Sequence, residues 1–181
     1  RPFPRCKTRL YDDGIKTPLV IRWDGGNVAK NQKSKSIVSA IDIMPTLLEA
    51  ANLPIPETVQ GKSFLKVLKN PVEKFRTYAF AEHNWHDYEA YERMVRTKDF
   101  LYIYNARPQY PQSTSGDNHR DSSFQELVKV WRKGELTNLQ MDNFKAPRNF
   151  EELYDLRNDP QQLIDISKKP SYKTKLLEMR A

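Results

Sequence analysis

Apolar residues follow two different patterns along the chain, and the pattern changes near residue 70. Residues 18–23, PLVIRW, form a short apolar run that is bounded by Pro18 and by the turn residues at 24–26. Such a run is typical of a strand that is covered on both faces and that has parallel neighbours. From Ile37 to Ala51 the apolar residues recur every three or four positions, which predicts a packing helix.

Asp42 and Pro45 indicate where this helix begins. If it begins near Asp42, that side chain can cap free backbone amides, and a proline in the first turn loses no hydrogen bond. The next segment, residues 53–70, predicts an extended turn and then a short helix through Phe64, which Asn70 and the following proline end.

Beyond residue 71 the chain is rich in closely spaced strand-like runs. Partial alternation predicts an antiparallel meander from TYAFAEH, ERMVRT and FLYIYN, at residues 77–83, 92–97 and 100–105. Residues 105–120 are rich in proline and small polar residues and predict a long loop. A helix capped by Asp121 and ended by Gly134, a strand at 151–156 and a helix at 171–181 complete the pattern.

These elements predict an α/β chain in two parts. Residues 1–70 contain one buried strand with its helices, and residues 71–181 form a smaller α+β part, an antiparallel sheet packed by a helix. Without neighbours, the strand and the helix at 43–51 would expose apolar faces. The chain alone is therefore expected to self-associate, to rearrange or to be unstable.

Composition adds an electrostatic preference. The 181 residues include 30 Lys and Arg against 23 Asp and Glu, a formal net charge of +7. This excess favours an anionic partner, such as a sulfated glycan, nucleic acid or an acidic surface, or it is simply solvated surface. Nucleic acid is not expected, because no basic stripe is interleaved with aromatic residues. No apolar run is long enough to predict a membrane span.

Three segments in fixed order resemble the sulfatase family. They are KTRLYDDGIKTPLVIRW, SAIDIMPTLLEAANLPIPETVQGKSFL and ELYDLRNDP, at residues 7–23, 39–65 and 152–160. The resemblance implies the C-terminal part of an alkaline-phosphatase-like sulfatase fold. Residues 1–70 would then be the end of the large α/β domain, and residues 71–181 the small C-terminal α+β subdomain.

The first segment carries the candidate catalytic residue. In sulfatases a lysine just ahead of such a Tyr-Asp/Glu-x-Gly turn contacts the sulfate group, and here that lysine is Lys7. An ammonium can offset the negative charge that builds on sulfate oxygens during hydrolysis. By composition alone Lys7 would be a loop lysine in water. Tyr11 and Gly14 are interpreted as structural, with Gly14 supplying a backbone angle that other residues resist.

A second resemblance suggests substrate-binding residues. The stretch AEHNWHDY at residues 81–88, together with residues 93–105 and 122–136, is similar to the heparan N-sulfatase (N-sulfoglucosamine sulfohydrolase) branch. It implies that His83 and His86 bond sugar hydroxyls or the sulfate at the pocket rim. It also implies that Glu82 binds a hydroxyl and that Arg93 or Arg96 binds a uronate or sulfate.

The same stretch has less specific interpretations. It can be a solvated loop without function, or a His-x-x-His metal pair, although no third ligand is apparent. Trp85 and Tyr88 either stack on a sugar or close the small sheet against its helix. A basic module that binds sulfated glycans without chemistry is the alternative function.

Two features of the family are missing from the sequence. Sulfatases use a formylglycine made from a Cys/Ser-x-Pro-x-Arg motif, and the single cysteine, Cys6, lacks the proline and arginine. The calcium of the family is held mainly by residues of the N-terminal part, so no metal is expected in this chain alone. The resemblance thus implies a fragment that is inactive alone, whose partner is the missing N-terminal half. Its location would be lysosomal, or exported to the periplasm or secreted.

Overall fold

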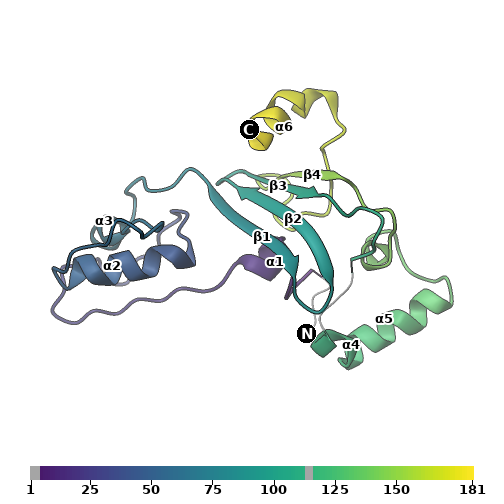
Figure 1. Ribbon diagram of the computed structural model, residues 1–181, viewed down its shortest axis with the longest axis horizontal. Coiled ribbons are helices and arrows are strands. Elements are labelled where there is room, and N and C mark those ends of the chain that lie inside the picture. The colour runs from purple at the N-terminus through teal and green to yellow at the C-terminus, as the bar shows by residue number, and fades with distance from the viewer. Residues whose placement is uncertain (1–4, 113–115) are drawn as a thin grey trace. The chain divides into compact units, whose positions relative to one another are not determined.

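The computed structural model describes residues 5–112 and 116–181, which form two compact units (Figure 1). One unit is Pro18–Ala79, and the other joins the residues up to Thr17 to Phe80–Ala181. The segment at 5–17 therefore packs with the sheet that lies far from it in sequence. The predicted division at residue 71 concerns the domains of a whole sulfatase and stays a prediction.

The larger unit is built on a four-stranded sheet with the order β1-β2-β3-β4. The strands are Ala79–Trp85, Glu89–Arg96, Phe100–Asn105 and Glu151–Asp155. Strand β3 is antiparallel to both β2 and β4. The predicted meander is confirmed, because the three runs form the successive neighbouring strands β1, β2 and β3, and β2 and β3 pair antiparallel.

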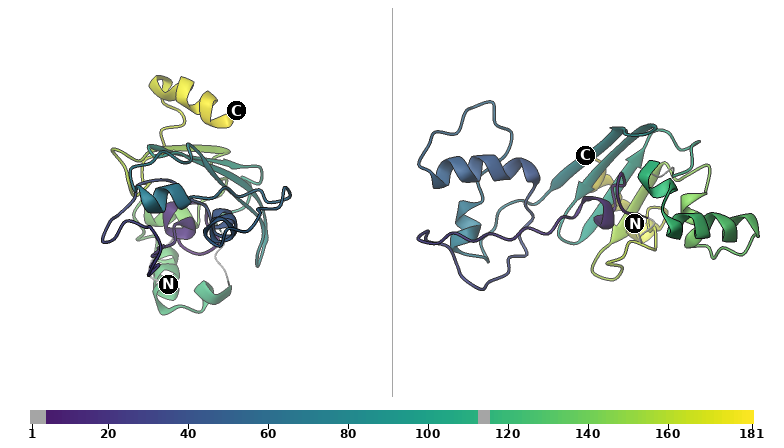
Figure 2. Two further views of the ribbon diagram at one scale, coloured as in Figure 1. Left: turned by 90° about the vertical axis from the view of Figure 1, so that its left-hand side faces the viewer. Right: turned by 90° about the horizontal axis from the view of Figure 1, so that it is seen from below.

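The two faces of the sheet are covered by different ends of the unit (Figures 1 and 2). Leu101 and Ile103 of β3 pack with Leu10 and Tyr11, which lead into helix α1, Asp12–Ile15. On the opposite face, Phe100 contacts the ring of Tyr172 at 6.3 Å between centroids. This tyrosine ends η3, Pro170–Tyr172, and leads into α6, Lys173–Arg180. The predicted terminal helix is thus present.

Helix α5, Ser122–Arg132, confirms the predicted helix between Asp121 and Gly134. The Asp121 side chain accepts a hydrogen bond from the Ser123 amide at 3.2 Å, and Gly134 has a φ of +74°. The helix packs on the segment that holds η2, Gln140–Asn143, where Trp131 stacks on Phe144 at 4.6 Å.

The predicted loop at 105–120 contains a short helix, α4, Gly116–His119. Residues 113–115 of that loop lie outside the described residues, as do residues 1–4 at the start of the chain. None of the described helices has the length and the apolar character needed to cross a membrane.

The smaller unit contains η1, Ala40–Asp42, α2, Ile43–Ala50, and α3, Leu65–Lys69. Both predicted helices are confirmed, but the prediction that the Asp42 side chain caps α2 is wrong. That carboxylate accepts the backbone amides of Ser39 at 2.9 Å and Lys62 at 2.8 Å, and it pairs with Arg76. Asp42 therefore holds three separate segments of this unit together.

The strand predicted at 18–23 is not formed, and its apolar side chains are exposed, as expected for this segment without neighbouring strands. These residues are extended and exposed, and the Val20 side chain is 90% exposed. A strand satisfies its N–H and C=O groups only against a neighbour, and none of the described segments pairs with this one. Helix α2 likewise leaves Ile43, Met44 and Leu47 exposed, as expected for an apolar face without a partner.

This exposed face of α2 gives a testable prediction. The 181-residue chain alone is expected to self-associate, because an uncovered apolar face is an interaction surface. Replacing both Met44 and Leu47 with lysine should shift it toward a monomer in analytical ultracentrifugation. Val72, which is isolated and 85% exposed, gives the control, since Val72→Lys should leave association unchanged. A monomeric wild-type chain would contradict the prediction.

Candidate functional site

Lys7 lies at a corner where three segments meet. Its ammonium pairs with the Asp117 carboxylate of α4. The first residue of α4, Gly116, donates its backbone amide to Asp87 Oδ2 at 2.5 Å, and Asp87 is at the tip of the β1–β2 hairpin. These contacts with α4 bring Lys7 and the hairpin tip together. Figure 1 shows where α4 lies relative to strands β1 and β2.

Arg9 is buried behind the Lys7 turn and links it to the hairpin and to the segment before α4. Its side chain is buried, with 3% of the residue exposed. The guanidinium donates to the Tyr88 hydroxyl at 3.3 Å and to the Gln112 carbonyl at 2.5 Å. Thr8, between Lys7 and Arg9, has a φ of +73°. The turn that presents Lys7 is therefore tightly folded and anchored on both sides.

Gly14 is required at this turn for a reason that the sequence did not predict. The proposed special backbone angle is wrong, because the positive-φ glycines of the structure are Gly25 and Gly134. A β-carbon at Gly14 would lie only 2.2 Å from the Arg9 carbonyl oxygen and 2.9 Å from that of Cys6. The residue must lack a side chain because α1 packs directly against the Lys7 turn.

Of the two candidate histidines, His86 is the one beside the Lys7 corner. Its Nδ1 lies 3.2 Å from Asp87 Oδ2, and its side chain is 43% exposed. The hydrogen bond from the Gly116 amide lowers the pKa of Asp87. Asp87 therefore stays ionised and links His86 to α4 and so to Lys7.

Glu82 and Arg93 face each other on neighbouring strands. Arg93 Nη2 lies 3.3 Å from Glu82 Oε2, and Nη1 donates to Asn84 Oδ1 at 2.7 Å. The guanidinium also covers the Tyr91 ring at 4.1 Å. These side chains form an exposed polar cluster on β1 and β2, where both predicted groups remain accessible to a ligand.

His83 occupies a different environment from His86. It is 8% exposed, and its Nδ1 lies 3.1 Å from Glu92 Oε2. Its ring also meets Tyr88 edge-on at 5.4 Å. Its role as a substrate contact stays a prediction, since in this structure the ring is buried against Glu92 and Tyr88 of the hairpin.

A buried polar network supports this site and was not predicted from the sequence. Glu92 binds both His83 and Arg148. Glu152 accepts the hydroxyls of Tyr11 and Tyr154, each at 2.7 Å. One signal was available, because alternation in the run EELYDL places Glu152 on the same face as buried Tyr154.

The ionisation of Glu92 follows from its partners. Burial alone would raise the pKa of this carboxyl. The hydrogen bond with His83 and the charges of Arg148 and Arg9 outweigh that effect and lower the pKa to about 2. Glu92 is therefore an anion inside the sheet, matched by the cations around it.

The model of the family described as N-sulphoglucosamine sulphohydrolase, C-terminal, matches residues 6–107, more than half of the chain. The chain belongs to this sulfatase family. The matched residues include the Lys7 turn, the hairpin and strand β3, whereas α4, which completes the corner, lies outside the match.

Curated sulfatases match almost the whole chain but are much longer. An ulvan-active sulfatase of Formosa agariphila is 35% identical over 181 residues, which cover 99% of this chain and 30% of that protein. The human N-sulphoglucosamine sulphohydrolase is 27% identical, and the match covers 98% of this chain and 37% of that protein. The chain thus spans about a third of the length of these sulfatases.

Solved sulfatase structures confirm the fold. A 2-O GAG sulfatase superposes with a TM-score of 0.56 at 20% identity, covering 86% of this chain and 26% of that one. The predicted fold, the C-terminal part of an alkaline-phosphatase-like sulfatase, is confirmed by such neighbours.

The residues described here do not fit the calcium that the family resemblance implies. Among residues 5–112 and 116–181, no three His, Cys, Asp or Glu side chains converge as metal ligands would. Calcium is bound by several converging oxygen ligands. The described residues of this chain therefore do not form a calcium site by themselves.

Acid should destabilise this sulfatase unit through Glu92. Because its pKa is lower in the folded state than in the unfolded state, its stabilising contribution is present above about pH 4.3 and is lost as pH falls toward 2. Urea unfolding between pH 7 and pH 2.5 should show this loss. The Glu92→Gln protein should be less stable at pH 7 but depend less on pH, and equal pH dependence would contradict the assignment.

Proposed function

We propose that this chain is the C-terminal part of a sulfatase that hydrolyses sulfate esters or sulfamates on a glycan, with Lys7 contacting the sulfate group. The observation that carries the proposal is the anchored corner. Arg9 and α4 join the Lys7 turn to the hairpin that bears His86. A sulfate and its sugar can therefore be held by one rigid part of the chain.

The chemistry of Lys7 suits this role. Its present partner, Asp117, has a side chain that is 71% exposed, and such surface ion pairs contribute at most about 1 kcal/mol. A sulfate group can replace that carboxylate at little cost. The ammonium would then stabilise negative charge on the sulfate oxygens and on the leaving atom, and it would do so most strongly where water is excluded.

The sugar would lie against the hairpin. We place His86 next to the substrate, where its free ring nitrogen can donate to or accept from a hydroxyl. Glu82 and Arg93 would contact hydroxyl and acidic groups. His83 reaches a ligand only if the hairpin shifts, so we propose that its contribution depends on such a movement.

The remaining parts of the site would come from residues outside this chain. We propose that the N-terminal half of the same protein supplies the formylglycine nucleophile and the ligands of a calcium ion, and that this chain is inactive without it. The exposed segment at 18–23 is suited to pair with that half. Secretion, the periplasm or the lysosome would be the location of such a protein.

The substrate class rests on the relatives. One is named for N-sulphoglucosamine and another for ulvan, so we propose a sulfated glycan, with N-sulfoglucosamine of heparan sulfate as the first candidate. The test is sulfate release by the full-length protein from N-sulfoglucosamine and from N-acetylglucosamine-6-sulfate. Release from the first alone would identify a sulfamate, and release from the second alone would identify an ester.

The net charge of +7 favours a second candidate, a basic module that binds sulfated glycans without chemistry. That function predicts binding to heparin that weakens steeply with salt. It also predicts no sulfate release by the full-length protein from any sulfated sugar, a result that would replace the enzyme proposal.

A further inference from the structure

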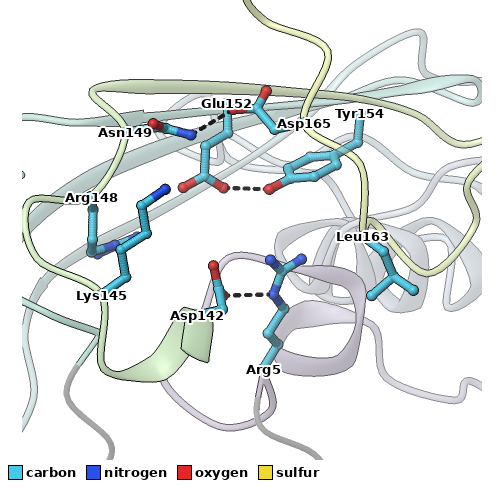
Figure 3. Close-up of a pocket in the computed structure, with 9 residues that line it drawn as sticks. All are labelled: Arg5, Asp142, Lys145, Arg148, Asn149, Glu152, Tyr154, Leu163 and Asp165. Atoms are coloured by element: carbon cyan, nitrogen blue, oxygen red, sulfur yellow. Dashed lines mark hydrogen bonds and ion pairs between the residues drawn. The ribbon is translucent and has the colours of Figure 1, made fainter. Parts of the chain in front are cut away.

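A pocket of about 150 Å³ opens beside β4 in the larger unit (Figure 3). Its lining includes three cationic side chains, Arg5, Lys145 and Arg148, and three carboxyl groups, Asp142, Glu152 and Asp165. A polar pocket of this size has room for several water molecules or for one small ligand group.

Two of the carboxyl groups are already engaged. Asp142 Oδ2 accepts from Arg5 Nε at 3.0 Å. Asp165 Oδ2 accepts from Asn149 at 2.8 Å, and its Oδ1 accepts the Leu153 amide at 3.1 Å. Asp142 is therefore paired with a cation, whereas Asp165 is held in place by neutral donors.

Glu152 is engaged through one oxygen, the one that accepts both tyrosine hydroxyls. Its other oxygen points toward the side of the pocket where Lys145 lies (Figure 3). Burial raises the pKa of this carboxyl, so that it holds a proton more readily than an exposed glutamate does.

The donors of the pocket that remain for a ligand are on two cationic side chains, Arg148 and Lys145. Arg148 uses Nη1 on Glu92, and its Nε is buried without a partner among the described residues. A buried N–H without a partner indicates a missing ligand or water. Lys145 is exposed, and its ammonium extends toward Glu152 (Figure 3). The cations and carboxyl groups of the lining are equal in number, and the donors that the pocket offers to a ligand are Arg148 Nε and the Lys145 ammonium.

We propose that this pocket binds a small oxyanion, a sulfate or a carboxylate group, held by Lys145 and Arg148. Hydrogen bonds from charged donors to such groups are short and strong, and a partly enclosed site screens them less than open solvent does. The group arrives either as a free ion or attached to a sugar. The site requires no activity at Lys7.

The test is calorimetric titration of the full-length protein carrying Lys7→Met, in which anion binding at Lys7 is removed. The probes are inorganic sulfate, glucuronate and N-acetylglucosamine-6-sulfate at constant ionic strength. We expect saturable binding that Lys145→Met weakens about tenfold or more, the loss of one charged hydrogen bond. Lys168→Met, at another exposed lysine, should leave the affinity unchanged.

Comparing the three probes shows whether the bound group comes from a glycan or from a free ion. Tighter binding of the sugar acids than of inorganic sulfate would assign the pocket to a glycan, and equal binding would assign it to free oxyanions. Because Lys145 is exposed, adding Lys145→Met should leave the melting temperature of the Lys7→Met protein unchanged. Thermal unfolding of the same preparations checks this. The proposal would be overturned if no probe bound saturably, or if Lys145→Met left the affinity unchanged.

Discussion

Replacing Lys7 with alanine is expected to lower the rate of sulfate release by the full-length protein by about 10² to 10³, the usual effect of removing one donor to a developing charge. The loss should lie mainly in kcat if Lys7 acts on the transition state, and in KM if it only holds the substrate. The measurement is steady-state sulfate release from N-sulfoglucosamine or the best alternative sulfated sugar.

Lys16 provides the matched control, since it is an exposed lysine of the same segment. Lys16→Ala should retain full activity, and both variants should melt at the wild-type temperature. Undiminished turnover in Lys7→Ala would remove this residue from the site. Equal losses in both variants would show that general positive charge, rather than the position of Lys7, is responsible.

Replacing Glu92 with leucine is expected to lower the free energy of unfolding by about 3–5 kcal/mol, because it leaves a buried cation without its partner. Arg148, whose side chain is 9% exposed, then keeps its charge inside the sheet. Unfolding of the wild-type and variant proteins in urea at pH 7 measures the difference.

Glu89 is the control on the same strand. It pairs with Arg107 at 3.0 Å, but both side chains are about half exposed, so Glu89→Leu should change stability by no more than about 1 kcal/mol. A Glu92→Leu protein as stable as the Glu89→Leu protein would mean that Arg148 finds water or another partner, and that the buried pair is dispensable.

The sequence predicted those elements whose stability is local. The meander and α5 are present because alternation, capping by Asp121 and the glycine at position 134 act within a few residues of each other. The strand at 18–23 was predicted from the same kind of pattern and is absent. A strand requires hydrogen bonds to another segment, and its own residues cannot specify whether that segment belongs to this chain.

The candidate site was predicted only in part for a related reason. The motif identified Lys7, and the richness of residues 82–93 in functional side chains identified the hairpin. The contacts that bring them together could not be predicted, because Arg9 and Tyr88 are 79 positions apart and Lys7 and Asp117 are 110 apart. Such pairs depend on strand register and loop packing, which one sequence does not encode in its local pattern.

The anchoring of the Lys7 turn by Arg9 has a consequence for protein engineering. Because the guanidinium contacts Tyr88 at the hairpin tip, the hairpin and the turn form one transferable module. A hairpin grafted from another sulfatase to change substrate preference would leave Arg9 buried without its hydroxyl partner unless the graft also carries a hydrogen-bond acceptor at position 88. Chimeras should therefore exchange residues 7–14 and 79–96 together with α4, which contacts both segments.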